Sequence, residues 1–379
     1  MEKTIAERTM SNKKNQHFVP RFLLRNFSAG NDCKSIGVWV IESEAYIPYA
    51  SIKHQACADY FYGKGPELEN AFETIEGRIA PLLEYIALKR HLPEKFSEDH
   101  VGLIGFVVSL SLRTQYQADS VNENADALFK AAFKDDPQVK GEIDHLVIRN
   151  DGAPALALSS LENCVIVSLD LDYKLLANKT NHKFITSDNP VIKCNQFYGY
   201  RDSLRGHLGF ASAGLQLLLS IDPDTCLLLY DRDTYGVGAK KQSIVQLCDL
   251  KDVDAINTFE YLNAYKSLYF NNEVTEAYIR NIADREKAHR RKLKPEIVEY
   301  KALDPSPGSE QSIIQLCQPV IKQDLRLSFV RILKKAKKIG VHPGSLDLRE
   351  PELVQFLTKD RDTPPAWLDK IPKFYSRRS

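Results

Sequence analysis

The N-terminal segment holds the histidine best placed for chemistry. His17 precedes Pro20, where we expect a short helix to begin, and a neutral imidazole there can act as an acid, a base or a metal ligand. Arg21 and Arg25 follow one helical turn apart, so their guanidinium groups share a face and can grip a phosphate. The structural alternatives are a histidine that hydrogen-bonds the backbone at this turn and an arginine face that is solvated or ion-paired.

Three glutamates form a second cluster that could do chemistry. Glu69, Glu73 and Glu76 lie at spacings of four and three, so they share one face of a helix. Like charges at that spacing repel unless a cation lies opposite, which makes Glu69 and Glu76 candidate metal ligands. Arg113 follows a long apolar run, and a buried guanidinium there must be paired. We assign it to charge stabilisation, and a structural salt-bridge network is the alternative.

A third candidate is the aspartate of the sequence TSDNP, which ends an expected strand. Asp188 can cap backbone N–H groups in a turn of the Asx type. Alternatively, it faces a cleft with His17 and acts as a general base or metal ligand. Asn257, in a later helical segment, either completes that pocket or caps a loop.

Established catalytic motifs are missing from the chain. It contains no H-E-x-x-H, G-x-S-x-G, Walker or G-x-G-x-x-G sequence. Asp172-x-Lys174 has the acid-x-lysine spacing of restriction-type nucleases, but about four such matches are expected by chance in this composition. With His17, Asp188, Arg25 and Arg113 as candidate catalytic residues, we predict a hydrolase of a phosphate-containing substrate, with a metal-dependent nuclease using Mg²⁺ or Mn²⁺ as its specific form. A non-enzymatic binding protein with a structural polar network is the alternative.

The charges are balanced over the whole chain but not locally. Fifty-one Lys and Arg against 50 Asp and Glu give a net charge of +1, so the total charge makes no case for nucleic-acid binding. Two basic runs near the C-terminus could follow a phosphate backbone, or they form solvated helix faces. The candidate nucleic-acid-binding residues in them are Arg290, Arg291, Lys292, Lys334 and Lys335.

Periodicity predicts the elements that must position these residues. Strands are expected over 36–42 and 46–51, and apolar residues at helical spacing predict a helix over 67–90 that Pro81 kinks or divides. A helix capped by Ser97 is apolar nearly all round, which places it at the centre of the fold. Beyond it we expect a strand over 164–175 with a returning partner at 183–186, a hairpin across 222–225, and a helix over 252–270. This order predicts an α+β fold of antiparallel hairpins packed with long helices.

The division of the chain and its compartment follow from composition. We expect an α+β core over 15–270 and a basic C-terminal appendage over 271–379. No apolar run reaches about 18 residues, and the seven scattered cysteines form no C-x-x-C pair. These features predict a cytoplasmic protein with no membrane association and reduced thiols. The oligomeric state and the choice of Met1 or Met10 as the start stay open.

A set of motifs follows in order along the first two thirds of the chain: Asn15-x-His17-x-Val19-Pro20-x-Phe22-x-Leu24-Arg25-x-Phe27, Tyr62, Arg113, Phe184 to Val191 and Asn257. In these motifs the sequence resembles the uncharacterised bacterial domain of unknown function 4238 family over about 15–270. At Ile221-Asp222-Pro223 the chain departs from the family's tendency towards a serine before the proline. The resemblance implies a cytoplasmic bacterial protein, and it supplies no catalytic residues to transfer.

Overall fold

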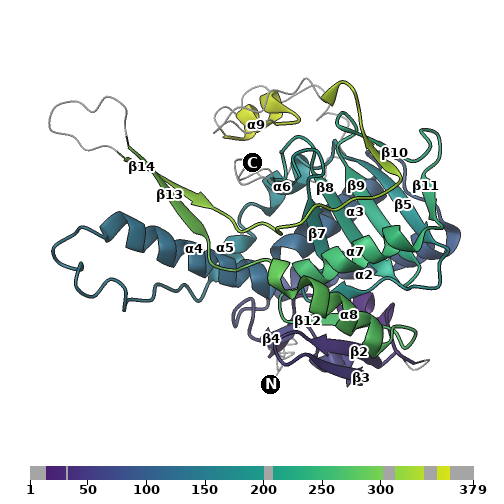
Figure 1. Cartoon of the computed structure of the whole chain (residues 1–379), viewed down its shortest axis with the longest axis horizontal. Coiled ribbons are helices and arrows are strands. Elements are labelled where there is room, and N and C mark those ends of the chain that lie inside the picture. The colour runs from purple at the N-terminus through teal and green to yellow at the C-terminus, as the bar shows by residue number, and fades with distance from the viewer. Residues whose placement is uncertain (1–13, 31–32, 200–207, 302–311, 337–347, 359–379) are drawn as a thin grey trace, which may run out of the picture.

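The centre of the molecule is a five-stranded sheet in the order β11-β5-β9-β8-β7 (Figure 1). The computed structural model describes residues 14–30, 33–199, 208–301, 312–336 and 348–358. Within the sheet, β11 pairs with β5 in parallel and the other neighbours are antiparallel. The Asp222 carboxylate accepts a hydrogen bond from the Asp224 N–H at 2.7 Å and closes the predicted hairpin, which is confirmed as β8–β9. The strands are β5 (Asp172–Asn178), β7 (Val191–Cys194), β8 (Gln216–Asp222), β9 (Thr225–Tyr230) and β11 (Ile244–Leu247).

Helices cover both faces of this sheet. The long helices α2 (Glu67–Lys89) and α3 (Glu98–Leu112) lie on one face, and α7 (Leu250–Asn263) and α8 (Glu276–Glu286) lie on the other (Figure 1). Because alternate strand residues point to opposite faces, Leu217 packs in the core on the α3 side and Leu218 in the core on the α7 side. Eleven of the 15 residues of α3 are buried, and the Ser97 side chain accepts a hydrogen bond from the His100 N–H. Both predictions for this helix are confirmed.

A second sheet, in the order β3-β2-β12-β6, organises the N-terminal motif. It contains β2 (Ser35–Val40), β3 (Ala45–Ser51), β6 (Thr186–Ser187) and β12 (Ser267–Phe270), all antiparallel. Beside it, β1 (Asn15–His17) pairs with β4 (Cys57–Asp59). The short helices α1 (Arg21–Arg25) and η1 (Ile52–His54) contact each other. The predicted strands 36–42 and 46–51 are therefore confirmed.

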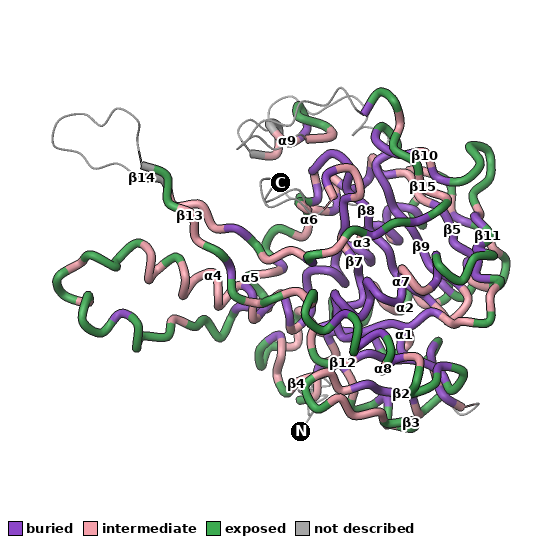
Figure 2. The backbone as a smooth tube through the Cα atoms, viewed as in Figure 1, coloured by how far each residue is buried: buried purple, intermediate pink, exposed green. Residues whose placement is uncertain are grey.

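The helix α4 (Gln115–Phe133) and the strand pair β13 (Glu296–Lys301) and β14 (Ser312–Cys317) project from the body (Figure 1). Figure 2 shows that exposed residues dominate the far part of this arm, whereas buried residues fill the central sheet and its helices.

Residues from both sides of position 270 share one core, because Ile279 of α8 and Leu325 pack there with Leu228. The remaining elements are α5 (Ala153–Ala157), α6 (Leu161–Ile166), β10 (Tyr235–Val237), η2 (Lys287–His289), β15 (Val330–Ile332) and α9 (Pro351–Thr358).

Three local predictions are wrong although the α+β class is confirmed. Residues 164–175 are not one strand, because α6 ends at Ile166 and β5 begins only at Asp172. The predicted returning partner pairs instead as β6 with β12, and the helix expected over 252–270 ends at Asn263 before that strand. A short apolar run can form either a buried helix or a buried strand, and in residues 164–175 tertiary packing determines which one forms. Pro81 lies inside α2 without dividing it.

Two further expectations concern the whole chain. Within the described ranges, no helix is both long and apolar enough to cross a bilayer. The seven cysteines all lie in those ranges and are free thiols, as predicted from their spacing. Met10 lies outside the described residues.

Candidate functional site

A pocket of about 340 Å³ opens where β1, α1, η1 and α2 meet. It brings together four of the residues predicted from the sequence, namely His17, Arg25, Glu69 and Glu76. The residues that α2 contributes recur at spacings of three and four, so they form one face of that helix. The lining residues are Asn15, His17, Arg21, Phe22, Arg25, Lys53, Glu69, Phe72, Glu73, Glu76, Gly77 and Ala80.

His17 is the titratable group at the β1 side of the pocket. It is half-buried in the strand, and its Nε2 atom is buried without a hydrogen-bond partner among the described residues. Burial lowers the pKa of His17 to about 4, and the charge of Arg21 acts in the same direction. Hydrogen bonding to the backbone of Lys53 and Ile52 opposes that shift. The imidazole is therefore neutral at neutral pH, and it keeps an unpaired nitrogen for a proton or a ligand.

Cationic side chains from two short helices form one wall. Arg21 and Arg25 lie four residues apart on α1, as their spacing predicts, and both are exposed. Lys53 joins them from η1. Sequence reasoning missed Lys53, because only the packing of η1 against α1 brings it near residues 30 positions earlier. Three cations around one opening favour an anionic ligand group.

Glutamates of α2 form the opposite wall, and one of them, Glu76, pairs with the buried Arg113. The Arg113 Nη1 atom lies 2.9 Å from Glu76 Oε1, and the Arg113 side chain is 1% exposed. Its guanidinium also lies 4.6 Å from the centre of the Phe72 ring, while Nε and Nη2 are buried without partners among the described residues. Burial raises the pKa of Glu76, and Arg113 opposes that rise. Arg113 therefore holds Glu76 at the pocket wall and does not itself line the pocket.

The predicted metal role of Glu69 and Glu76 finds no ligand cluster. In the part of the chain that the structure describes, no three His, Cys, Asp or Glu side chains lie close enough to hold a metal ion. Structural divalent sites need several such ligands at once. Glu69 and Glu76 line the pocket as predicted, and their metal ligation stays a prediction.

Asp188 lies elsewhere, in the interior of the protein. It is 4% exposed, and its carboxylate accepts hydrogen bonds from the N–H groups of Tyr265 at 2.8 Å, Lys266 at 2.7 Å and Ser267 at 3.2 Å. Burial raises the pKa of Asp188 to about 6 against the effect of those three donors. Asp188 therefore caps backbone N–H groups, which is the structural role that the sequence also allowed for it. The structure does not bring Asp188 to the pocket of His17.

Asn257 also serves the backbone. Its Oδ1 accepts a hydrogen bond from the Ile185 N–H at 3.1 Å, and its Nδ2 donates to the Lys183 carbonyl at 2.8 Å. Nδ2 also lies 2.9 Å from the Tyr278 hydroxyl. The amide thus fixes the loop before β6 and faces no described pocket, which is the capping role considered for it.

The acid-x-lysine pair of β5 is occupied by other contacts. Asp172 lies 2.6 Å from the Lys95 ammonium, and Lys174 donates hydrogen bonds to the carbonyl groups of Ala239 and Gln242. Neither residue lines the pocket of His17. The contacts of Asp172 and Lys174 therefore give no support to a nuclease role for this pair beyond its spacing in the sequence.

Three of the five basic residues proposed for nucleic acid contact other parts of the chain, and two are exposed. Arg290 donates to the carbonyl groups of Ala264 and Tyr265 at the end of α7, and Arg291 lies over the Tyr116 ring at 5.4 Å. Lys335 forms an ion pair with Asp233 in the turn before β10. Lys292 and Lys334 are exposed.

Comparisons with known proteins place the chain in one family. The family model described as "Protein of unknown function (DUF4238)" matches residues 15–274. The matched range contains every residue that lines the pocket of His17. No curated protein and no solved structure matches the chain.

Proposed function

The chain belongs to the DUF4238 family, and we propose that it is a hydrolase that acts on a phosphate-containing substrate in the pocket between α1 and α2. One observation carries the proposal: a half-buried, neutral histidine with an unpaired nitrogen lines the same pocket as three cationic side chains. A base beside an anion-binding wall is the arrangement that phosphoester hydrolysis requires.

The cationic wall binds the phosphate. Arg21 and Arg25 present guanidinium groups that can each donate two parallel hydrogen bonds to phosphate oxygens, and Lys53 adds a point charge. These donors also stabilise the negative charge that builds up on phosphorus-bound oxygens in the transition state. Their loss should therefore weaken both binding and turnover.

His17 activates water. The imidazole takes a proton from a water molecule as that oxygen bonds to phosphorus, the phosphorus–oxygen ester bond breaks, and the departing oxygen is protonated by solvent in the open pocket. The products are an alcohol and a phosphate. A bound phosphate raises the pKa of the imidazole and so makes it a stronger base than it is in the empty pocket.

The glutamate wall selects the rest of the substrate. Glu69, Glu73 and Glu76 repel a second phosphate on that side and accept hydrogen bonds from hydroxyl or amino groups. The substrate that fits has a phosphate at one end and hydrogen-bond donors at the other, as a nucleotide or a phosphorylated sugar does. The ion pair with Arg113 keeps the Glu76 carboxylate in place.

Turnover assays test the proposal. The full chain is incubated with labelled RNA, labelled DNA, a nucleotide and a phosphorylated sugar, each with Mg²⁺, with Mn²⁺ and with a chelator. We expect hydrolysis of at least one substrate and its loss in His17→Gln. His54→Gln is the matched control, because His54 is an exposed histidine of η1 that does not line the pocket.

The outcomes separate the two functional readings. Turnover that requires added metal supports the nuclease form, and turnover with chelator supports metal-independent acid–base chemistry. Turnover that persists in a folded His17→Gln variant overturns the role of His17. Binding without turnover of any substrate, weakened in Arg25→Ala, would favour the non-enzymatic binding protein and overturn the hydrolase.

A further inference from the structure

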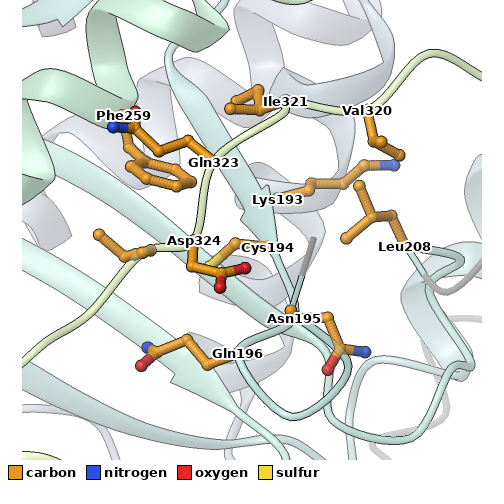
Figure 3. Close-up of a pocket in the computed structure, with 12 residues that line it drawn as sticks. Lys193, Cys194, Asn195, Gln196, Leu208, Phe259, Val320, Ile321, Gln323 and Asp324 are labelled. Carbon is orange, nitrogen blue, oxygen red and sulfur yellow. The ribbon is translucent and has the colours of Figure 1, made fainter. Parts of the chain in front are cut away.

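Two further cavities of the described residues lie outside the pocket of His17. The smaller one, of about 40 Å³, lies between the end of β7 and residues 320–325, and both Lys193 and Asp324 line it (Figure 3). It has room for only a few water molecules. The larger one, of about 650 Å³, lies along β11 and is lined by residues 238–239 and 241–246. We call it the β11 groove, and it shares no lining residue with the other two cavities.

The β11 groove runs beside an open edge of the central sheet. β11 is the outermost strand in the order β11-β5-β9-β8-β7 (Figure 1). On its inner side, the Ser243 carbonyl accepts a hydrogen bond from the Leu175 N–H at 2.9 Å. Because backbone groups alternate in direction along a strand, the N–H and C=O groups of Ile244 and Gln246 point away from β5. Among the described residues, no other backbone group bonds to them.

An extended peptide fits such an edge. A strand that pairs with β11 would form hydrogen bonds with both backbone groups of Ile244 and of Gln246. Ile244 is half-buried and Val245 is buried, so an apolar peptide centre would continue the surface of the sheet. The volume of the groove lies within the range of about 300–1,000 Å³ that is usual for ligand pockets.

The loop before β11 is anchored to the central sheet. Lys174 of β5 is buried, and its ammonium donates hydrogen bonds to the carbonyl groups of Ala239 and Gln242. Lys241 lies between these two anchor points, is exposed and lines the groove. The wall of the groove is therefore formed before a partner binds, which lowers the cost of ordering it.

Exposed lysines lie at both ends of β11. Lys240 and Lys241 precede the strand, and Lys179 lies at its other end, where its N–H donates to the Leu247 carbonyl at 2.9 Å. None of these three lysines forms an ion pair with a described residue. The nearby carboxylate of Asp249 caps the first turn of α7. Positive charge at both ends favours a partner with acidic residues on either side of a short extended centre.

We propose that the β11 groove binds an extended acidic segment of another protein, which pairs with β11 as an additional strand of the central sheet. The outward backbone groups of Ile244 and Gln246 supply the hydrogen bonds, and the lysines select for acidic residues. This docking site goes beyond the proposed hydrolase activity, and it stands or falls independently because the two sites share no lining residue.

Fluorescence anisotropy with the full chain tests the docking site. The probe is a fluorescein-labelled octapeptide, Glu-Glu-Val-Thr-Val-Thr-Glu-Glu, whose four central residues match the length of β11. We expect saturable binding of this probe. The same peptide N-methylated at its four central residues keeps every side chain but loses the backbone donors, so it should bind about tenfold more weakly. Replacing its four glutamates by lysines should abolish binding.

Variants of the protein test the two halves of the proposal. Gln246→Pro removes an N–H group that points away from β5 and leaves the bonds to β5 in place, and it should weaken binding about tenfold. Lys241→Glu should weaken binding about fivefold, the size of one exposed ion pair. Lys64→Glu changes an exposed lysine that does not line the groove, so it is the matched control and should bind as the parent does. Circular dichroism establishes that the variants are folded.

Four results would overturn the proposal. The first is equal binding of the N-methylated peptide, which tests the backbone bonds without altering the protein. The second is unchanged binding in a folded Lys241→Glu variant. The third is displacement of the peptide by a single-stranded octanucleotide at lower concentrations than by unlabelled peptide, which would identify a nucleic-acid site. The fourth is a dimer of the protein alone in sedimentation velocity that Gln246→Pro abolishes, because a second copy would then fill the edge.

Discussion

Replacing Glu76 by glutamine should destabilise the protein by leaving the Arg113 charge buried and unpaired. The substitution keeps the size of the side chain and removes the negative charge 2.9 Å from Arg113 Nη1. Removing one partner of a buried ion pair costs about 3–5 kcal/mol. Glu76 is 24% exposed and the Phe72 ring still contacts the guanidinium, so we expect a cost just below this range, about 2–3 kcal/mol.

Urea unfolding followed by circular dichroism measures the effect. Glu73→Gln is the matched control, because Glu73 is exposed on the same face of α2, and it should change the free energy of unfolding by less than about 0.5 kcal/mol. The double variant Glu76→Gln with Arg113→Met should recover most of the loss, since it removes both charges.

Two results would refute the reasoning. A Glu76→Gln variant within about 0.5 kcal/mol of the parent would show that Arg113 does not depend on Glu76. A double variant as unstable as the sum of the two single variants would show that the two side chains act independently. Either result would remove the physical link between the pocket wall and the core of α3.

Three further predictions concern titratable groups. Burial raises the pKa of Glu260 well above its usual value. The free energy of unfolding should therefore fall as the pH rises from about 4.5, because the unfolded chain loses this proton more readily than the folded protein does. Urea unfolding of Glu260→Gln should lack this pH dependence. Asp188→Asn should lower the free energy of unfolding by about 2–3 kcal/mol, because one acceptor oxygen becomes a donor that faces backbone N–H groups. Turnover per folded molecule should stay unchanged. A stable Asp188→Asn variant without turnover would contradict this prediction. Protonation of His17 in the empty pocket should lower kcat/KM below about pH 4, and a kcat/KM that is independent of pH through that range would exclude His17 as the base.

The site illustrates what spacing in a sequence can predict. The spacings of Glu69, Glu73 and Glu76 predict one helix face, and the four-residue spacing of Arg21 and Arg25 predicts another, because helix geometry is local. That these two faces border one pocket depends on how α1 packs beside α2. The sequence predicts each helix face, but it does not predict how the two faces lie relative to each other.

The misassigned segment 164–175 shows where local sequence patterns fail to predict secondary structure. Val165, Leu169 and Leu171 all pack in the core beneath α3, and a short apolar run can reach that core as a helix or as a strand. The strand begins only where Asp172 meets Tyr230 of β9. Pairing with a residue almost 60 positions later is a tertiary contact, so no local pattern places that boundary.

The buried polar groups of this protein differ in whether the chain itself satisfies them, and this difference separates scaffold from site. Three backbone donors bind Asp188, and backbone atoms bind both ends of the Asn257 amide, so no ligand is needed to explain either residue. His17 Nε2, beside the pocket between α1 and α2, is buried without a partner in the described ranges. Because a buried polar atom without a partner costs about 1–3 kcal/mol, such atoms at a cavity mark the places where a ligand would stabilise the fold. The TSDNP motif stands out in the sequence as much as His17 does, yet only the count of hydrogen-bond partners assigns one to the scaffold and the other to the site.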